Sequence, residues 1–146
     1  MSTIVLKFGG TSVATTDLIK SAASIVKKEY DAGNNLAVVV SAMAGTTNSL
    51  INFVKEINSS VDSEYDVVVS SGEQVTSGLM SMALNQLGVP SRSWLGWQLP
   101  IITSGPHRNS LIEKINVEKI LKDFEEKKVA VLAGFQGISV EGRITT

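Results

Sequence analysis

The chain has 146 residues, with 43% hydrophobic and 18% charged residues and a formal net charge of −1. This length suffices for one domain with a sizeable core, and the near-neutral charge argues against disorder and against nucleic acid as a partner. The absence of cysteine excludes disulfides and thiolate chemistry, and the N-terminus shows neither a signal-peptide pattern nor an apolar run of membrane-spanning length. We therefore expect a soluble, cytoplasmic protein without membrane contact.

Two units of strand, loop and helix are predicted in the first part of the chain. The apolar run Ile4–Leu6 has a buried-strand pattern, and Thr15 or Thr16 is a natural cap for a helix that ends at Gly33. A second apolar strand, Leu36–Val40, leads through small residues into another helix. One face of that second helix carries the apolar residues Leu50, Phe53, Val54 and Ile57.

A third helix is predicted to begin near residue 70. Ser70 with Glu73, or Ser71 with Gln74, fits the reciprocal capping box that marks a helix start. The preceding run Val67–Val69 is compatible with a strand or with the end of a helix. The apolar stripe of the third helix is predicted to be Val75, Leu79, Met82, Ala83 and Leu87.

Short strands and one more helix complete the predicted fold. Apolar strands without polar alternation, interleaved with amphipathic helices, indicate an α/β fold in which a mainly parallel sheet is sandwiched by helices. The remaining predicted elements are strands at Arg92–Trp94 and Ile101–Thr103, a helix capped by Asn116, a strand at Val129–Ala133 and a hairpin over residues 138–146.

Four loops are placed where a parallel sheet usually binds its ligand. Such ligands collect at the carboxyl ends of the strands, where the N-termini of helices attract anions. Neither the Walker phosphate loop nor the Gly-x-Gly-x-x-Gly pattern is present. The four loops expected to converge on one site are Lys7–Ser12, Ser41–Thr47, Ser70–Glu73 and Gly134–Gly137.

The residues alone leave two interpretations open for each candidate. Gly9 and Gly10 beside Lys7 fit a phosphate held by backbone amides and a cation, but they also fit a tight turn beside a solvated lysine. Thr47 is equally a natural helix cap, and Glu73 is equally a capping-box partner.

The ordered set of these loops resembles a known family. Its motifs here are Lys-Phe-Gly-Gly-Thr-Ser at Lys7–Ser12, Val-Ser-Ala-Met-Ala-Gly-Thr-Thr-Asn at Val40–Asn48, Ser-Gly-Glu-Gln at Ser71–Gln74 and Ala-Gly-Phe-Gln-Gly at Ala133–Gly137. Together they resemble the aspartokinases, within the amino acid kinase superfamily, and the resemblance covers essentially the whole chain.

The resemblance implies transfer of the γ-phosphoryl group of ATP, accompanied by Mg²⁺, to the side-chain carboxylate of L-aspartate, at the start of lysine, threonine and methionine biosynthesis. The acceptor is already a nucleophile, so positioning and charge neutralisation carry the reaction and no general base is needed. By this resemblance the catalytic residue is Lys7, the phosphate-binding residues are Lys7, Phe8, Gly9, Gly10 and Ser41, and the aspartate-binding residues are Thr47, Glu73 and Phe135; no metal ligand is assigned.

The resemblance also implies that residues 1–146 are the N-terminal, aspartate-binding part of a kinase domain. In the family, a pair like Thr145-Thr146 continues into an arginine- and glycine-rich loop, then into the nucleotide-binding half and the regulatory ACT domains. We therefore expect the chain to be inactive alone. His107 is followed by Arg108, where the family commonly has glycine, and we assign no function to that loop.

Two other functions remain as alternatives. One is a related acid kinase that acts on glutamate or acetylglutamate, although Glu73 favours a substrate with a free ammonium group. The other is a non-catalytic half-domain that assembles with a partner chain. An open sheet edge and exposed apolar surface both promote association, and we expect a homo-oligomer or association through the open surface.

Overall fold

Parallel strands form the centre of the molecule. The computed structural model describes residues 2–58 and 60–146, and its main sheet has four strands, all parallel, in the order β1-β2-β6-β3. The strands span Thr3–Phe8 (β1), Asn35–Val40 (β2), Ser91–Trp94 (β3) and Val129–Ala133 (β6). This arrangement confirms the predicted α/β fold.

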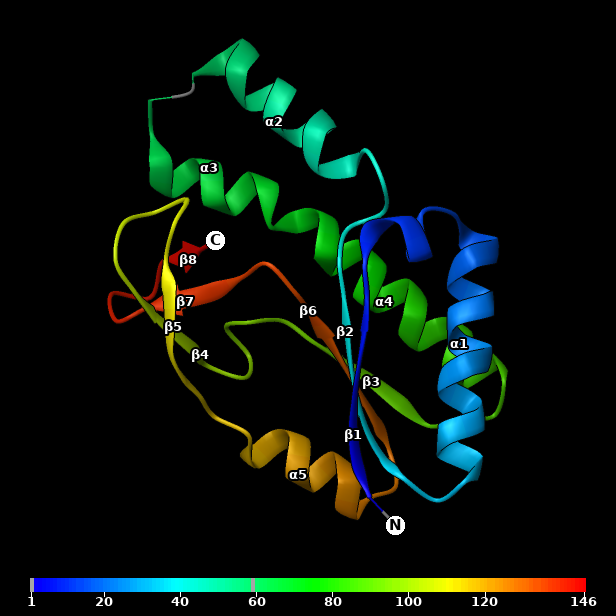
Figure 1. Ribbon diagram of the computed structural model, residues 1–146. Helices are drawn as coiled ribbons and strands as arrows, with labels where there is room; N and C mark the ends of the chain where they lie inside the picture. The colour runs from blue at the N-terminus through cyan, green and yellow to red at the C-terminus, as the bar shows by residue number, and fades with distance from the viewer. Residues whose placement is uncertain (1, 59) are drawn as a thin grey trace.

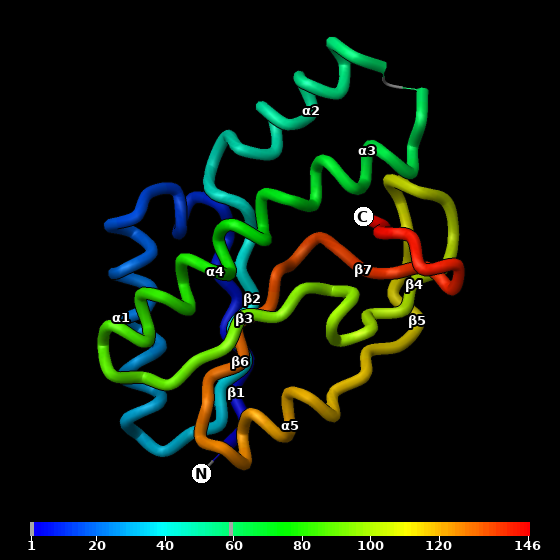
Figure 2. Tube along the Cα trace, turned by 180° about the vertical axis from the view of Figure 1, so that it is seen from behind, coloured from blue at the N-terminus to red at the C-terminus, as the bar shows by residue number. Residues whose placement is uncertain are grey.

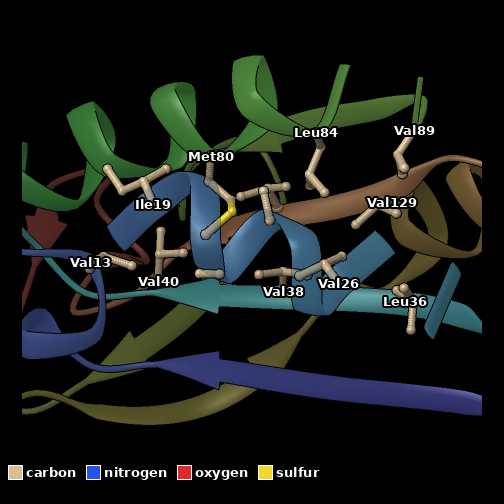
Figure 3. Close-up of a cluster of buried hydrophobic side chains, with 13 residues drawn as sticks. Val13, Ile19, Val26, Leu36, Val38, Val40, Met80, Leu84, Val89 and Val129 are labelled. Carbon is tan, nitrogen blue, oxygen red and sulfur yellow. The ribbon is translucent and has the colours of Figure 1, made fainter. Parts of the chain in front are cut away.

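Helices cover both faces of this sheet. Helices α1 (Thr16–Asp31) and α4 (Ser71–Gln86) pack side by side on one face, and the shorter α5 (Glu118–Glu125) packs on the other (Figure 1). The larger core cluster lies between α1, α4 and the sheet, where Met80 and Leu84 of α4 meet Val38 of β2 (Figure 3). A second cluster joins α5 to the opposite face through Ile120 and Phe124.

Of two predicted helix caps, one is present. The side chain of Thr15 accepts a hydrogen bond from the Leu18 amide at 3.2 Å, at the start of α1. The N-cap of α5 is Val117 and not the predicted Asn116, but the side-chain oxygen of Asn116 accepts a hydrogen bond from the Glu118 amide at 3.0 Å, where α5 begins. Both satisfy backbone donors that the helix itself leaves unpaired.

The predicted capping box at the start of α4 is wrong. Residues 67–69 belong to a helix, α3 (Asp62–Val69), and only Ser70, itself in helical conformation, separates α3 from α4. The Ser70 and Ser71 hydroxyls therefore donate backward to the carbonyls of Val67 and Val68, and no side chain caps α4. Glu73 is thereby left without its predicted structural role.

The predicted apolar stripes of α4 and α2 are only partly right, because Leu79 and Ala83 pack against the core and Val54 is buried, whereas other members are exposed. In α4, Val75 is 57% and Met82 69% exposed, and in α2 (Thr46–Ile57) Phe53 and Ile57 are exposed. Small and polar residues of α4 face inward because they let the helix approach α1 and the sheet closely. The buried residues of α4 are Gly72, Glu73, Thr76, Ser77, Met80, Ser81 and Leu84.

A second, smaller sheet lies beside the carboxyl ends of the first (Figures 1 and 2). It has the order β5-β4-β7-β8, and its β7–β8 pair is the predicted C-terminal hairpin. The sequence did not predict β5, because Leu-Ile-Glu-Lys-Ile does not alternate apolar and polar residues. In the structure all five residues of β5 are exposed. The strands are β4 (Ile101–Ser104), β5 (Leu111–Ile115), β7 (Gly137–Ser139) and β8 (Ile144–Thr145).

The orientation of α4 can be tested with two truncations on the same helix. Leu84→Ala removes a fully buried side chain and should lower the free energy of unfolding by about 2–5 kcal/mol. Met82→Ala, the matched control on the exposed face, should cost less than about 0.5 kcal/mol. Urea denaturation measures both values, and a larger loss for Met82→Ala would contradict this orientation.

Candidate functional site

The register of the main sheet brings three loops to one level. Phe8 lies opposite Val40, and Val40 lies opposite Ala133, so β1, β2 and β6 end together. The Ser41 amide then donates to the Phe8 carbonyl, and the Gly134 amide donates to the Val40 carbonyl, each at 3.0 Å. The loops that follow these strands are therefore held against one another from their first residue.

A cavity of about 530 Å³ opens where these loops meet the start of α4. All four predicted loops contribute to it, so their predicted convergence is confirmed. Phe8 and Gly9 do not line the cavity, although both belong to the first loop. The predicted site residues that do line it are Lys7, Gly10, Ser41, Thr47, Glu73 and Phe135.

Two glycines allow the loop after β2 to sit between β1 and α4. A Cβ on Gly10 would lie 2.9 Å from the Ala42 carbonyl oxygen, closer than real Cβ contacts. A Cβ on Gly72 would lie 2.7 Å from the Cβ of Ala42. Gly10 therefore does more than form a turn, because any side chain there would push the first two loops apart.

Lys7 and Thr47 both leave polar groups for the cavity. The Lys7 side chain is exposed, and its ammonium group forms no ion pair within residues 2–58 and 60–146. Thr47 does not cap α2, because Gly45 occupies the N-cap and no side chain there accepts a capping hydrogen bond. The structural alternative for Thr47 is therefore wrong, and its half-buried side chain borders the cavity.

Glu73 is a buried carboxylate with one unused oxygen. Its side chain is 3% exposed, and Oε1 accepts a hydrogen bond from the Ala42 amide at 3.0 Å. Oε2 has no hydrogen-bond partner among the residues that the structure describes. Burial raises the pKa of the Glu73 carboxyl above its ordinary value, and the Ala42 amide partly opposes this shift. A cationic ligand group could complete this half-satisfied carboxylate.

Gln136 ties the fourth loop to the other elements of the site. Its side-chain amide donates to the Ser70 carbonyl at 3.1 Å, and its side-chain oxygen accepts from the Gly96 amide at 3.0 Å. The neighbouring Phe135 has a φ of 52° and is 51% exposed at the edge of the cavity. In the sequence, Gln136 stands out only as part of the Ala133–Gly137 motif, and the local pattern does not predict these long-range contacts.

The loop that contains His107 packs against buried Asp66 of α3. Nδ1 of His107 lies 2.6 Å from the Asp66 carboxylate, the Arg108 amide donates to it, and Thr146 Oγ1 donates to it at 2.5 Å. Arg108 has a φ of 66°, a conformation that favours glycine. Its guanidinium is held by an ion pair to Asp62 at 2.9 Å and lies over the Tyr65 ring, so these contacts offset the strain.

Neither a metal cage nor a membrane span is found within the described ranges. Those residues contain no group of three or more His, Cys, Asp or Glu side chains arranged to hold a metal ion. None of the described helices combines the length and the apolar character needed to cross a bilayer.

The chain belongs to the amino acid kinase family, whose sequence model matches residues 2–146. Its relatives include the aspartate kinase of Pseudomonas fluorescens, 48% identical over 149 residues, and the aspartokinase of Rickettsia felis, 45% identical over 150 residues. Both alignments cover 100% of this chain but only 36% and 37% of the relatives. The chain therefore spans about a third of the length of the curated relatives it matches.

Solved structures agree with this assignment. The crystal structure of aspartate kinase from Synechocystis has a TM-score of 0.79 at 38% identity and covers 97% of this chain and 23% of that one. The crystal structure of E. coli aspartokinase III in complex with aspartate and ADP has a TM-score of 0.83, covering 100% of this chain and 43% of that one. At 23% identity, the second comparison shows the fold alone. The resemblance to aspartokinases predicted from the motifs is confirmed.

The raised pKa of Glu73 predicts a specific dependence of stability on pH. The folded chain binds the Glu73 proton more tightly than the unfolded chain, so the stability that protonated Glu73 contributes should be lost as pH rises from 4.5 through the raised pKa. Glu73→Gln cannot titrate and should lack this decline. Denaturant unfolding of both proteins across the acidic range measures the difference, and parallel pH profiles would contradict the burial of an ionisable Glu73.

Proposed function

We propose that the chain supplies the aspartate-binding and phosphate-facing part of an aspartate kinase, which transfers the γ-phosphoryl group of ATP to the side-chain carboxylate of L-aspartate. The observation that carries the proposal is one cavity lined by both a cation, Lys7 near the end of β1, and an incompletely bonded carboxylate, Glu73 in the first turn of α4. A substrate with an ammonium group at one end and a carboxylate at the other matches this pair.

The proposed roles of the site residues follow from their charge and from their positions around the cavity. Glu73 would accept the ammonium group of aspartate through Oε2, while Thr47 and Phe135 would border the bound substrate. Lys7 would neutralise charge on the transferring phosphoryl group, and the backbone at Gly10 would approach the phosphates where no side chain intervenes. Ser41 would lie beside the same phosphates, with Phe8 and Gly9 shaping the loop.

No general base is required for this reaction. The substrate carboxylate is ionised at neutral pH and attacks the phosphorus directly, so the residues need only position it and stabilise negative charge. The cavity is compatible with this requirement, since Lys7, Gly10 and the loop after β2 line it. ATP would bring Mg²⁺, which supplies further charge neutralisation when bound, and this chain's residues would contribute the lysine and the loop amides.

The length of the chain relative to its relatives affects whether it is expected to catalyse the reaction alone. Because it spans about a third of its relatives' length, we propose that adenosine binding and regulation belong to parts of an aspartate kinase outside residues 1–146. We also propose that this part alone binds aspartate but does not turn over.

A second candidate is assembly with another chain. Strand β1 is an edge strand of the described sheet, and its Val5 is 66% exposed. An unpaired edge strand with exposed apolar side chains promotes association. Self-association through this edge is compatible with the kinase proposal and is distinguished from a purely non-catalytic role by aspartate binding.

Aspartate binding is the direct test of the proposed site. Glu73→Gln removes the charge opposite the substrate ammonium group and Thr47→Val removes a hydroxyl, so each should weaken L-aspartate binding about tenfold. Thr46→Val is the matched control, because Thr46 does not line the cavity, and should bind as the parent does. Calorimetric titration measures all four proteins; equal affinities would contradict the assignment.

Competition between acids separates the proposed substrate from its alternatives. L-aspartate should bind more tightly than L-glutamate, and N-acetyl-L-glutamate should not bind, because it lacks the ammonium group that Glu73 would hold. Binding of the acetylated acid alone would overturn the assignment in favour of the related acid kinase.

Turnover can be measured independently of binding. The folded chain with Mg²⁺-ATP and L-aspartate should form no aspartyl hydroxamate when hydroxylamine is present to trap an acyl phosphate. Aspartyl hydroxamate formed by the parent and abolished by Lys7→Met would show that residues 1–146 suffice, contradicting the proposed inactivity while supporting the proposed reaction.

A further inference from the structure

A second polar cavity, of about 480 Å³, lies between β3 and α5, on the sheet face opposite α1. It shares no lining residue with the candidate site. Three cationic side chains border it, Arg92 of β3 and Lys119 and Lys122 of α5, together with Trp94 and Trp97. Its volume is within the range of small-molecule sites.

The lining of this cavity carries more positive than negative charge, with three cations against two carboxylates. Lys119 donates to a neutral group, the Gln98 carbonyl, at 2.6 Å. No ion pair of Arg92 or Lys122 occurs in the part of the chain that the structure describes. Of the two acidic residues, Glu126 pairs with Lys128, which lies outside the lining, at 2.5 Å. Asp123 accepts a hydrogen bond from the neutral indole N–H of Trp94 at 2.5 Å, so its negative charge remains.

The aromatic wall of the cavity is fixed before any ligand binds. Trp94 is 5% exposed and its indole N–H is anchored on Asp123, which is itself buried. The Arg92 guanidinium lies 4.2 Å from the centroid of the Trp94 ring, a cation–π contact that sets its orientation. Trp97, by contrast, is 50% exposed and offers a free aromatic surface beside these cations.

The cations of the cavity also act on the carboxylate at its edge. The pKa of the Glu126 carboxyl is lowered, chiefly by Lys128 and more weakly by Lys122 and Arg92. The lining itself keeps a small excess of positive charge, although the chain as a whole carries a net charge of −1.

We propose that this cavity binds a small anion that carries a planar ring, an aromatic or heteroaromatic phosphate or carboxylate. The guanidinium and ammonium groups would hold the anionic end, since charge-assisted hydrogen bonds to phosphate and carboxylate are the strongest available here. The exposed face of Trp97 would stack on the ring. The site is independent of the proposed kinase activity.

The chain provides its own probe for this site. Its two tryptophans, Trp94 and Trp97, both line the cavity, so intrinsic tryptophan fluorescence reports on this cavity. Phenyl phosphate and benzoate should each give a saturable change, and the tighter of the two identifies the preferred anionic group. Inorganic phosphate and benzyl alcohol, which carry the anion and the ring separately, should bind more weakly than phenyl phosphate.

Two variants test whether the fluorescence change arises from binding in this cavity. Lys122→Gln should weaken phenyl phosphate binding by about threefold to tenfold, because one of three cations is lost. Lys20→Gln, the same chemical change on the exposed face of α1, should leave the affinity unchanged. The proposal is overturned if no ring-bearing anion saturates the signal, if inorganic phosphate binds as tightly as phenyl phosphate, or if Lys122→Gln binds as the parent does.

Discussion

The register of three parallel strands is the constraint on which the site depends. Because Phe8, Val40 and Ala133 are aligned across β1, β2 and β6, the loops that follow leave the sheet at one level. Hydrogen bonds from Ser41 to β1 and from Gly134 to β2 extend this alignment one residue beyond the strands. A one-residue slip of β1 would turn its side chains to the opposite face and move Lys7 away from the loops that follow β2 and β6.

A second constraint is the burial of Glu73, which is unfavourable for an ionised carboxylate with only one hydrogen bond. The Ala42 amide supplies that hydrogen bond, and the absence of a side chain on Gly72 leaves room for Ala42 to lie this close to α4. Such incompletely satisfied groups are typical of binding sites, where a ligand supplies the missing partner. The same position therefore weakens the folded chain and prepares it for a cationic group.

The sequence predicted the parts of this molecule that local pattern determines. The apolar runs predicted the main strands, Thr15 and Asn116 marked helix starts, and the four glycine-rich or small-residue loops indicated the site. The predictions from the sequence were wrong or incomplete where tertiary contacts determine the position of a side chain. The Ser70 hydroxyl bonds backward because α3 precedes it, Met82 is exposed because smaller residues of α4 face the sheet, and Gln136 acts through residues distant in sequence.

The most direct test of the central claim is residue-resolved NMR of the ¹⁵N-labelled chain titrated with L-aspartate. The amide of Ala42, which donates to Glu73, should shift together with those of Thr47 and Phe135, and the shifts should saturate with one common affinity. D-aspartate, with its ammonium group displaced, should produce smaller shifts. An aspartate site at Glu73 is contradicted if these amide signals do not shift while others do, or if both enantiomers give the same response.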